Sequence, residues 1–234
     1  MKNIKNPIEI LVHKNYKYRA FDSFRRGESL KFWDLTRLVL SGILVEPLQF
    51  AIFNFPGTIG MILRKITCKV LCGNIGYRSI LDSGIRISGY KNIYIDDYVW
   101  VDRSVELLSD TGYIKIGKRV HIAPHANIVG LAGVIIEDYA AVGRYAQVLS
   151  HSVVSEKGKY MSGPMVIESE KGGKSEEIII RKNAVISSGA IIMPGVEIGE
   201  GAIIGPNSLI LSNVKPWNIM LGVPARAVGI RDSF

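Results

Sequence analysis

Histidine is the side chain that most readily takes up and releases a proton near neutral pH. The chain has four histidines, His13, His121, His125 and His151. His151 lies in a Ser-His-Ser tripeptide, where a regular pattern of aliphatic residues gives way to a long irregular stretch. An imidazole beside a long loop on a rigid scaffold can act as a general base. We therefore select His151 as the candidate catalytic residue, and we interpret His13, outside the pattern, as a surface residue.

Two further polar residues precede His151 within the same pattern. His125 and Asn127 stand one repeat unit earlier and can orient either the imidazole or an acceptor molecule. Polar corner residues without any role fit this spacing equally well. The sequence contains no Gly-x-Ser-x-Gly turn, no phosphate-binding glycine-rich loop and no dinucleotide fingerprint. Candidate chemistry is therefore concentrated at the histidines.

A six-residue period defines the elements that must position these side chains. In the second half of the chain an aliphatic residue recurs at every sixth position, and a small or β-branched residue follows each one four places later. The aliphatic positions are Ile180, Ile186, Ile192, Ile198, Ile204 and Ile210. Such hexapeptides predict a parallel β-helix, in which each repeat forms one short strand and one corner and three repeats complete a coil. Gly or Asn at corners such as Gly189 and Asn207 suits the tight bends.

The same phase continues upstream with small slips. The aliphatic triplets there are Ile75, Leu81 and Ile87; Ile95, Val101 and Leu107; Ile116, Ile122 and Ile128; and Ile136, Val142 and Val148. Together the repeats predict about six coils. A long insertion at residues 152–177 is predicted to be an extruded functional loop, in which Tyr160 can line an acceptor pocket. The predicted division is an N-terminal segment (1–72), a β-helix (73–215) and a C-terminal cap (216–234).

The N-terminal segment, residues 1–72, is both basic and apolar. The formal net charge of the chain is +8, and residues 1–70 hold 12 Lys and Arg against 5 Asp and Glu, which gives 12 − 5 = +7. Its apolar stretch at 38–63 is interrupted by Glu46, Pro47, Asn54 and Pro56, which predicts two short helices and not one membrane-spanning helix. Basic, aromatic and aliphatic residues together favour contact with an anionic membrane face. A helical cap over the open end of the β-helix is the alternative.

The sequence also bears on nucleic-acid binding, on cellular location and on the state of the cysteines. No nucleic-acid partner is expected, because no recognisable reader motif accompanies the basic charge. No secretory signal is visible, so we expect a cytoplasmic protein, attached peripherally to the inner membrane if its N-terminal segment binds lipid. Cys68 and Cys72 are the only cysteines and are expected to be reduced core residues, since a second pair that would complete a metal site is missing.

Several segments together resemble a known family. They are IKIGKRVHIAPHANIV, VLSHSVV, KGKYMSGP, IIIRKNAVISSGAIIMPGVEIGEGAIIGPNSLIL and LGVPARAV. They are similar to the left-handed β-helix acetyltransferases, in particular galactoside, maltose and nodulation-sugar O-acetyltransferases and bacterial polysaccharide acetyltransferases. The resemblance covers roughly residues 75–228. It implies an all-β left-handed parallel β-helix with an N-terminal α-helical segment, and a homotrimer with acetyl-CoA in the cleft between neighbouring prisms.

The resemblance also carries residue roles. The family's catalytic histidine matches His151. Its coenzyme A contacts match Ser188, Pro206, Leu211 and Ser212. Leu211 and Ser212 replace a Thr-Lys pair that lies near the nucleotide phosphate, so Arg226, which matches a family arginine, or Lys215 is expected to meet the CoA 3′-phosphate. A second departure is an additional coil before His151.

The resulting expectation is an acetyl-CoA-dependent sugar O- or N-acetyltransferase of bacterial surface-glycan synthesis. His151 would deprotonate the acceptor in a direct transfer, with no metal. The acceptor is left open between lipid-linked, nucleotide-linked and free sugars. One alternative is a zinc enzyme of the γ-type carbonic anhydrase kind, because His121, His125 and His151 give the required number of ligands, although their spacing argues against it. The other is a non-catalytic trimeric scaffold at the membrane.

Overall fold

The structure is a computed structural model that describes residues 46–153, 159–160 and 172–232, together with isolated positions before residue 46. The chain forms two compact units, one of residues 1–52 with 155–172 and one of residues 53–154 with 173–234. The second unit holds the β-helix. His13 and most of the predicted N-terminal segment lie outside the described residues.

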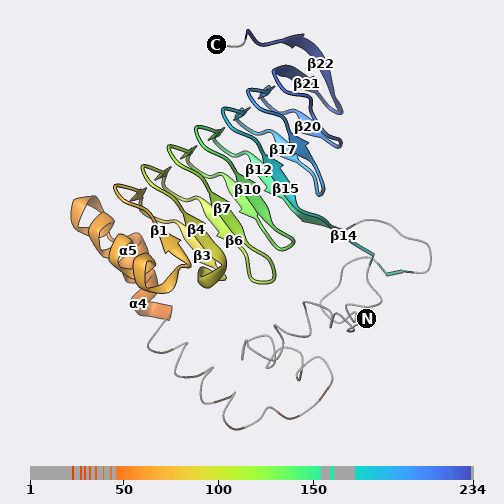
Figure 1. Cartoon of the computed structure of the whole chain (residues 1–234). Helices are drawn as coiled ribbons and strands as arrows, with labels where there is room; N and C mark the ends of the chain where they lie inside the picture. The colour runs from red at the N-terminus through yellow and green to blue at the C-terminus, as the bar shows by residue number, and fades with distance from the viewer. Residues whose placement is uncertain are drawn as a thin grey trace, which may run out of the picture. The chain divides into compact units, whose positions relative to one another are not determined.

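Three sheets of parallel strands form the β-helix, and each of its six coils contributes one strand to each sheet (Figure 1). Sheet B ends with two further strands, of which the last is antiparallel. Sheet A consists of β1 (Asn74–Ile75), β4 (Ile93–Ile95), β7 (Ile114–Ile116), β10 (Val134–Ile136), β15 (Ile178–Ile180) and β18 (Glu197–Ile198). Sheet B consists of β2 (Ile80–Leu81), β5 (Trp100–Val101), β8 (His121–Ile122), β11 (Ala141–Val142), β16 (Val185–Ile186), β19 (Ile203–Ile204), β21 (Asn218–Gly222) and β22 (Ala225–Ile230). Sheet C consists of β3 (Arg86–Ser88), β6 (Glu106–Leu108), β9 (Asn127–Val129), β12 (Gln147–Leu149), β17 (Ile191–Ile192) and β20 (Leu209–Ile210).

The register confirms the hexapeptide phase in all six coils. For example, Ile122 pairs with Val101 and Val142, and Ile128 pairs with Leu107 and Val148. Every aliphatic residue of the predicted triplets is buried. These side chains stack along the interior of the prism, and removing that apolar surface from water is the main stabilising contribution. The predicted left-handed parallel β-helix with an N-terminal helical segment is confirmed.

Two of the three corners have a residue with left-handed backbone conformation in every coil. The A–B corner, between sheets A and B, has a positive φ at Arg78, Tyr98, Arg119, Tyr139, Asn183, Gly201 and Trp217. The B–C corner has one at Gly84, Ser104, His125, Tyr145, Gly189 and Asn207. Gly and Asn were predicted for the last coils, whereas the aromatic and charged residues at the earlier corners were not. The C–A corner carries the extra residues, including a 3₁₀ turn at Tyr90–Asn92 and the long insertion.

Helix α4 (Glu46–Asn54) and helix α5 (Gly57–Leu71) are separated by Phe55 and Pro56, as the broken apolar pattern predicted. The residues of α5 that face the protein are Gly60, Arg64 and Cys68, and α5 contacts β1 and β2 at the first coil. The Nε of Arg64 donates to the carbonyl of Leu81 at 2.9 Å and its Nη1 to that of Phe55 at 2.7 Å. Arg64 is thus buried, although it is one of the 12 Lys and Arg residues of the N-terminal segment on which the predicted membrane contact rests. Within the described residues, no helix is long and apolar enough to cross a membrane.

Candidate functional site

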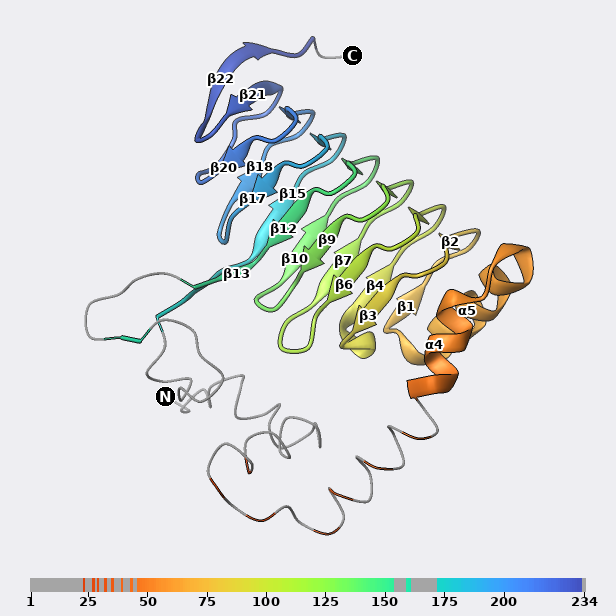
Figure 2. The same cartoon turned by 180° about the vertical axis from the view of Figure 1, so that it is seen from behind.

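His151 lies where the chain leaves sheet C. It begins β13 (His151–Ser152), which pairs antiparallel with β14 (Lys174–Ser175) and leads away from the stack of coils (Figure 2). Its Nδ1 is 2.7 Å from the Oγ of Ser175. When Nδ1 donates this proton to Ser175, Nε2 is left as the acceptor that a general base requires. The half-buried imidazole is therefore held in one orientation by the returning strand of the insertion.

The strand end before His151 is anchored by a buried serine. The Oγ of Ser150 donates to the carbonyl of Val129 at 2.8 Å and accepts from the amide of Ala132 at 3.0 Å. The amide of Glu176 donates to the carbonyl of Ser150 at 3.0 Å, so the outgoing and returning strands are tied at this point. Buried polar groups that are satisfied in this way fix local geometry. The rigid coil thus extends up to the histidine.

A polar groove lies at the other end of the sheet C strands, beside the B–C corner. The groove has a volume of about 350 Å³ and is lined by Ser104, Glu106, His125, Asn127, Tyr145 and Gln147. The rings of His125 and Tyr145, on adjacent coils of the B–C corner, stack with centroids 4.9 Å apart and an interplanar angle of 11°. The structure thus brings His125 and Asn127 together, and it adds four residues that the sequence analysis did not select. Aligning the coils in phase would have found Glu106 and Gln147, because both are paired in register with Asn127.

His151 and this groove occupy opposite ends of the sheet C strands. Gln147 opens β12 and His151 follows its end, four residues later. At about 3.3 Å per residue the separation along the strand is about 13 Å. The groove and the imidazole are therefore separate features along the strands of the same sheet.

The residues matched to coenzyme A contacts lie on the last two coils. Ser188 and Pro206 are exposed on the B–C corner, and the carbonyl of Ser188 accepts from the amide of Asn207 at 3.0 Å. Leu211 and Ser212 are exposed on the C–A corner, immediately after β20. The structure therefore places the pair Ser188 and Pro206 and the pair Leu211 and Ser212 at opposite ends of the sheet C strands.

The predicted phosphate partners are further along the chain. Arg226 lies in β22, opposite Leu221 of β21, and its Nη1 donates to the carbonyl of Ala225 at 3.0 Å. Lys215 is exposed. Both cations are accessible, as an interaction with a phosphate requires.

The other predicted residues have separate surroundings. His121 projects from sheet B, where its Nε2 is 2.8 Å from Asp102 Oδ2 and its ring meets the edge of Trp100. His121, His125 and His151 thus contact different neighbours. Throughout the described ranges, no group of three His, Cys, Asp or Glu residues is placed to hold a metal ion. Tyr160 belongs to the other compact unit, where it is exposed and its carbonyl accepts from the amide of Gly172 at 2.9 Å.

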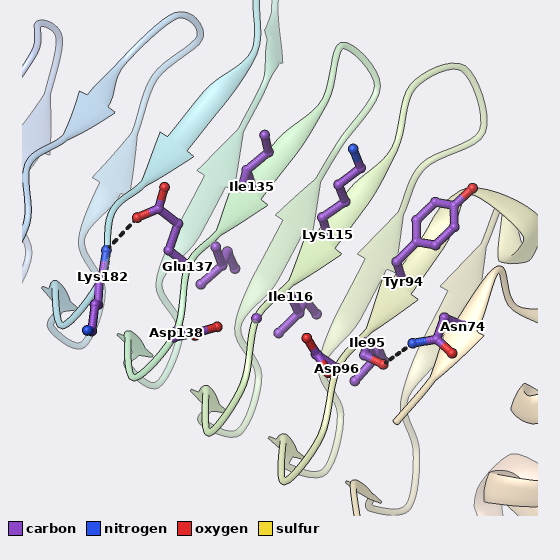
Figure 3. A pocket seen from close by; sticks show the side chains of 12 residues that line it. Asn74, Tyr94, Ile95, Asp96, Lys115, Ile116, Ile135, Glu137, Asp138 and Lys182 are labelled. Atoms are coloured by element: carbon purple, nitrogen blue, oxygen red, sulfur yellow. Dashed lines mark hydrogen bonds between the residues drawn. The ribbon is translucent and has the colours of Figure 1, made fainter. Parts of the chain in front are cut away.

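A second and larger hollow, of about 470 Å³, lies on the outer face of sheet A. Figure 3 shows Tyr94, Lys115 and Ile135 side by side on successive strands, with Glu137 and Lys182 at one end. The backbone amide of Lys182 donates to Glu137 Oε2 at 2.9 Å. None of the residues predicted for the site lines this hollow. We therefore place the candidate site on sheet C, because His125 and His151 and four of the predicted coenzyme A residues, Ser188, Pro206, Leu211 and Ser212, border its strands.

Comparisons with known proteins find similar acyltransferases. Residues 177–212 match the family model of the bacterial transferase hexapeptide (six repeats). A dTDP-4-amino-4,6-dideoxy-D-glucose acyltransferase from Escherichia coli is 29% identical over 164 residues, which cover 68% of this chain and 84% of that protein. AntD, an N-acyltransferase from Bacillus cereus solved with dTDP and 3-hydroxybutyryl-CoA, is 26% identical with a TM-score of 0.67, covering 76% of this chain and 91% of AntD. A hexapeptide-repeat acetyltransferase from Vibrio cholerae, solved with acetyl coenzyme A, shares the fold at 17% identity and a TM-score of 0.55, over 91% of this chain and 98% of its own.

Proposed function

We propose that this chain, a hexapeptide-repeat acyltransferase by its repeats, its fold and its relatives, transfers the acetyl group of acetyl-CoA to the amino group of a nucleotide-linked sugar. The observation that carries the proposal is the arrangement on sheet C. A histidine oriented by Ser175 lies at one end of the sheet C strands, a polar groove lies at the other end, and the coenzyme A positions lie on the next coils. AntD, an N-acyltransferase, was solved with dTDP and 3-hydroxybutyryl-CoA, and a mutant of it was solved with dTDP-4-amino-4,6-dideoxyglucose and coenzyme A. This similarity favours an amino-sugar acceptor over a hydroxyl.

His151 acts as the general base in the proposed reaction. The amino nitrogen attacks the thioester carbonyl while Nε2 of His151 accepts its proton. The tetrahedral oxyanion needs fixed hydrogen-bond donors, for which coil backbone amides or Ser188 are the candidates. Collapse of this intermediate breaks the carbon–sulfur bond, and the proton held by His151 neutralises the departing thiolate. The products are an N-acetylated sugar and coenzyme A, without a covalent enzyme intermediate.

Coenzyme A is proposed to bind along the last two coils. Leu211, more than half exposed, and the neighbouring Leu209 offer apolar contacts to the pantetheine arm. Ser188 and Pro206 offer backbone groups, and Arg226 or Lys215 offers a cation to the 3′-phosphate. We further propose a homotrimer in which Tyr160 of the insertion lines the acceptor site, and a cytoplasmic role in bacterial surface-glycan synthesis.

We also propose contact with an anionic membrane through the segment of residues 1–72. Opposite its buried side, α5 exposes Ile59, Ile62, Ile66 and Val70, each by more than half. These positions follow helical spacing and form one apolar stripe. Lys69 is exposed on the same helix, and the segment carries most of the net charge of the chain. Apolar side chains combined with basic charge suit binding to the surface of a bilayer.

The reaction is tested by release of coenzyme A thiol from acetyl-CoA with wild type and His151→Ala. The acceptors are free sugars, dTDP- and UDP-linked amino sugars, and prenyl-diphosphate-linked sugars. We expect release with a nucleotide-linked amino sugar, reduced by about 10²- to 10⁴-fold in kcat in the variant. His121→Ala, which alters a histidine on a different sheet, should remain close to wild type. Equal activity of His151→Ala would remove this residue from the mechanism, and release only with hydroxyl acceptors would contradict the amino-sugar proposal.

The membrane contact needs a test that preserves the first coil. Deleting residues 1–70 would also remove Arg64 and its hydrogen bonds to the coil, so a surface variant is preferable. Wild type should sediment with vesicles containing phosphatidylserine, and Ile62→Asp combined with Ile66→Asp should sediment much less. Phosphatidylcholine vesicles serve as the uncharged comparison. Equal sedimentation of the two proteins would show that α5 is not the contact surface.

A further inference from the structure

We propose that the polar groove on sheet C binds the pyrimidine base, thymine or uracil, of the acceptor nucleotide, with the base stacked on His125. This inference rests on the proposed function and specifies which part of the acceptor lies at each end of the sheet C strands. The base would lie at the B–C corner, and the diphosphate would lead along the strand toward His151.

The first observation is an incomplete aromatic stack. His125 and Tyr145 are exposed and stack at 4.9 Å, which is one coil spacing. The next corner residue on the His125 side is Ser104, and it also lines the groove. Ser104 lacks a ring, so the outer face of His125 lies open to the groove. A planar base at this level would occupy the place of a third ring, and stacking of bases on aromatic side chains is a major source of nucleotide affinity.

The contrast with the A–B corner supports this assignment. There Tyr98 is covered by Arg119 at 5.0 Å and Tyr139 by Lys182 at 5.9 Å, measured from cation to ring centroid. The pair of His125 and Tyr145 is followed by Gly189, the next residue of the B–C corner. The amide of Asn207 fills the place of a side chain at Gly189, because its Oδ1 would lie 2.1 Å from a Cβ built there. The open ring face at this corner is therefore the one that faces the groove.

The second observation is a polar row beside the stack. Glu106, Asn127 and Gln147 project from adjacent strands in register. The Oδ1 of Asn127 is buried and has no hydrogen-bond partner within the part of the chain that the structure describes. In the proposed complex this amide turns toward the groove, where it presents one donor and one acceptor to the base. The imide edge of thymine or uracil, with an N–H between two carbonyls, is complementary to such an amide, while Glu106 can accept from a ribose hydroxyl.

The test uses calorimetric binding of dTDP, UDP, ADP and acetyl-CoA to the full-length protein. The informative variant is Ser104→Tyr, which inserts the missing ring at a φ of 58°, the same φ at which Tyr145 is accommodated. We expect Ser104→Tyr to lose dTDP affinity by at least about tenfold, with His125→Ala and Asn127→Leu losing about tenfold each. The matched control is Asn183→Tyr, which inserts a ring at the A–B corner with a φ of 59° and should leave dTDP affinity unchanged. Acetyl-CoA affinity and the thermal midpoint should be unchanged in Ser104→Tyr.

Four results would overturn the subsite. They are full dTDP affinity in Ser104→Tyr, ADP binding that is as tight as dTDP binding and is lost in Ser104→Tyr, loss of acetyl-CoA affinity instead of dTDP affinity, and no binding of dTDP or UDP to wild type at millimolar concentration. Acyl transfer to a dTDP-linked amino sugar with unchanged variant affinities would refute the subsite and keep the transferase. Reduced affinities without any acyl transfer would keep the subsite and refute the proposed reaction.

Discussion

The A–B and B–C corners of this β-helix share one backbone conformation but differ in how their side chains are used. Both place a residue with positive φ at each coil. At the A–B corner the rings of Tyr98, Tyr139 and Trp217 are each paired with a cation from this chain. At the B–C corner His125 and Tyr145 pair with each other and border a groove. The repeat therefore fixes where a corner side chain stands, while its chemistry is left to the individual residue.

The largest effect is expected from the interior between the two corners, on β8. Ile122→Ala removes a fully buried side chain that stacks between Val101 and Val142. The free energy of unfolding should fall by about 2–5 kcal/mol, because the stacked coils cannot close the cavity. Chemical denaturation measures this change. A loss no larger than that of a corner variant would contradict the view that the stack, and not the corners, holds the prism together.

Glycine replacements compare the two corners directly. A Cβ at Gly201 of the A–B corner would lie 2.4 Å from the Trp217 ring, whereas one at Gly189 of the B–C corner would meet the movable amide of Asn207. Both have positive φ, which costs about 1–2 kcal/mol for a side chain. We expect Gly201→Ala to reach about 2 kcal/mol or more and Gly189→Ala about 1 kcal/mol in unfolding free energy. A larger loss of unfolding free energy in Gly189→Ala than in Gly201→Ala would show that the Trp217 ring moves aside more easily than the Asn207 amide.

Removing one ring from each corner separates stability from function. Tyr145→Ala should raise the KM for the nucleotide-linked acceptor by about tenfold, because one side of the stack that receives the base is lost. Tyr98→Ala, the matched change at the A–B corner, should leave kcat and KM near wild type. Steady-state kinetics at saturating acetyl-CoA measures both. A similar rise in KM for the two variants would erase the distinction between the corners.

The smallest effect is expected for a single cation. Arg119→Ala uncovers the Tyr98 ring and should lower the free energy of unfolding by about 0.5–1 kcal/mol, the usual size of an exposed cation–π contact. Ser104→Ala at the B–C corner should change it by less than that, because the hydroxyl covers no ring. Thermal melts of both variants beside wild type provide the comparison, and an equal loss would mean that the cation does not stabilise the ring.

Much of the fold could be predicted because the hexapeptide period is a local signal. The aliphatic triplets fixed the six coils and their register, and the broken apolar stretch predicted α4 and α5. The burial of Arg64 could not be predicted, because its partners are backbone carbonyls of Leu81 and Phe55 that only the folded chain brings near.

The candidate site was predictable only in part. His151 and His125 were found by residue type and position in the repeat. Ser175, which orients His151, lies 24 residues further along, across the insertion, and no local pattern links the two. Tyr145 and Ser104 share a corner with His125 at coil spacing, but Tyr and Ser with positive φ give none of the signal that Gly or Asn would give.

The two ends of the prism explain why one molecule does not extend the sheets of another. Stacked parallel coils expose unpaired strand edges at each end, and such edges are templates for association between molecules. Helix α5 lies against β1 and β2 at the first coil, and β22 pairs antiparallel with β21 after the last. Each cover interrupts the parallel register that would otherwise let one molecule extend the sheet of the next. A chain that lost either cover would present a growing edge, and end-to-end polymerisation into fibres would compete with folding into a single unit.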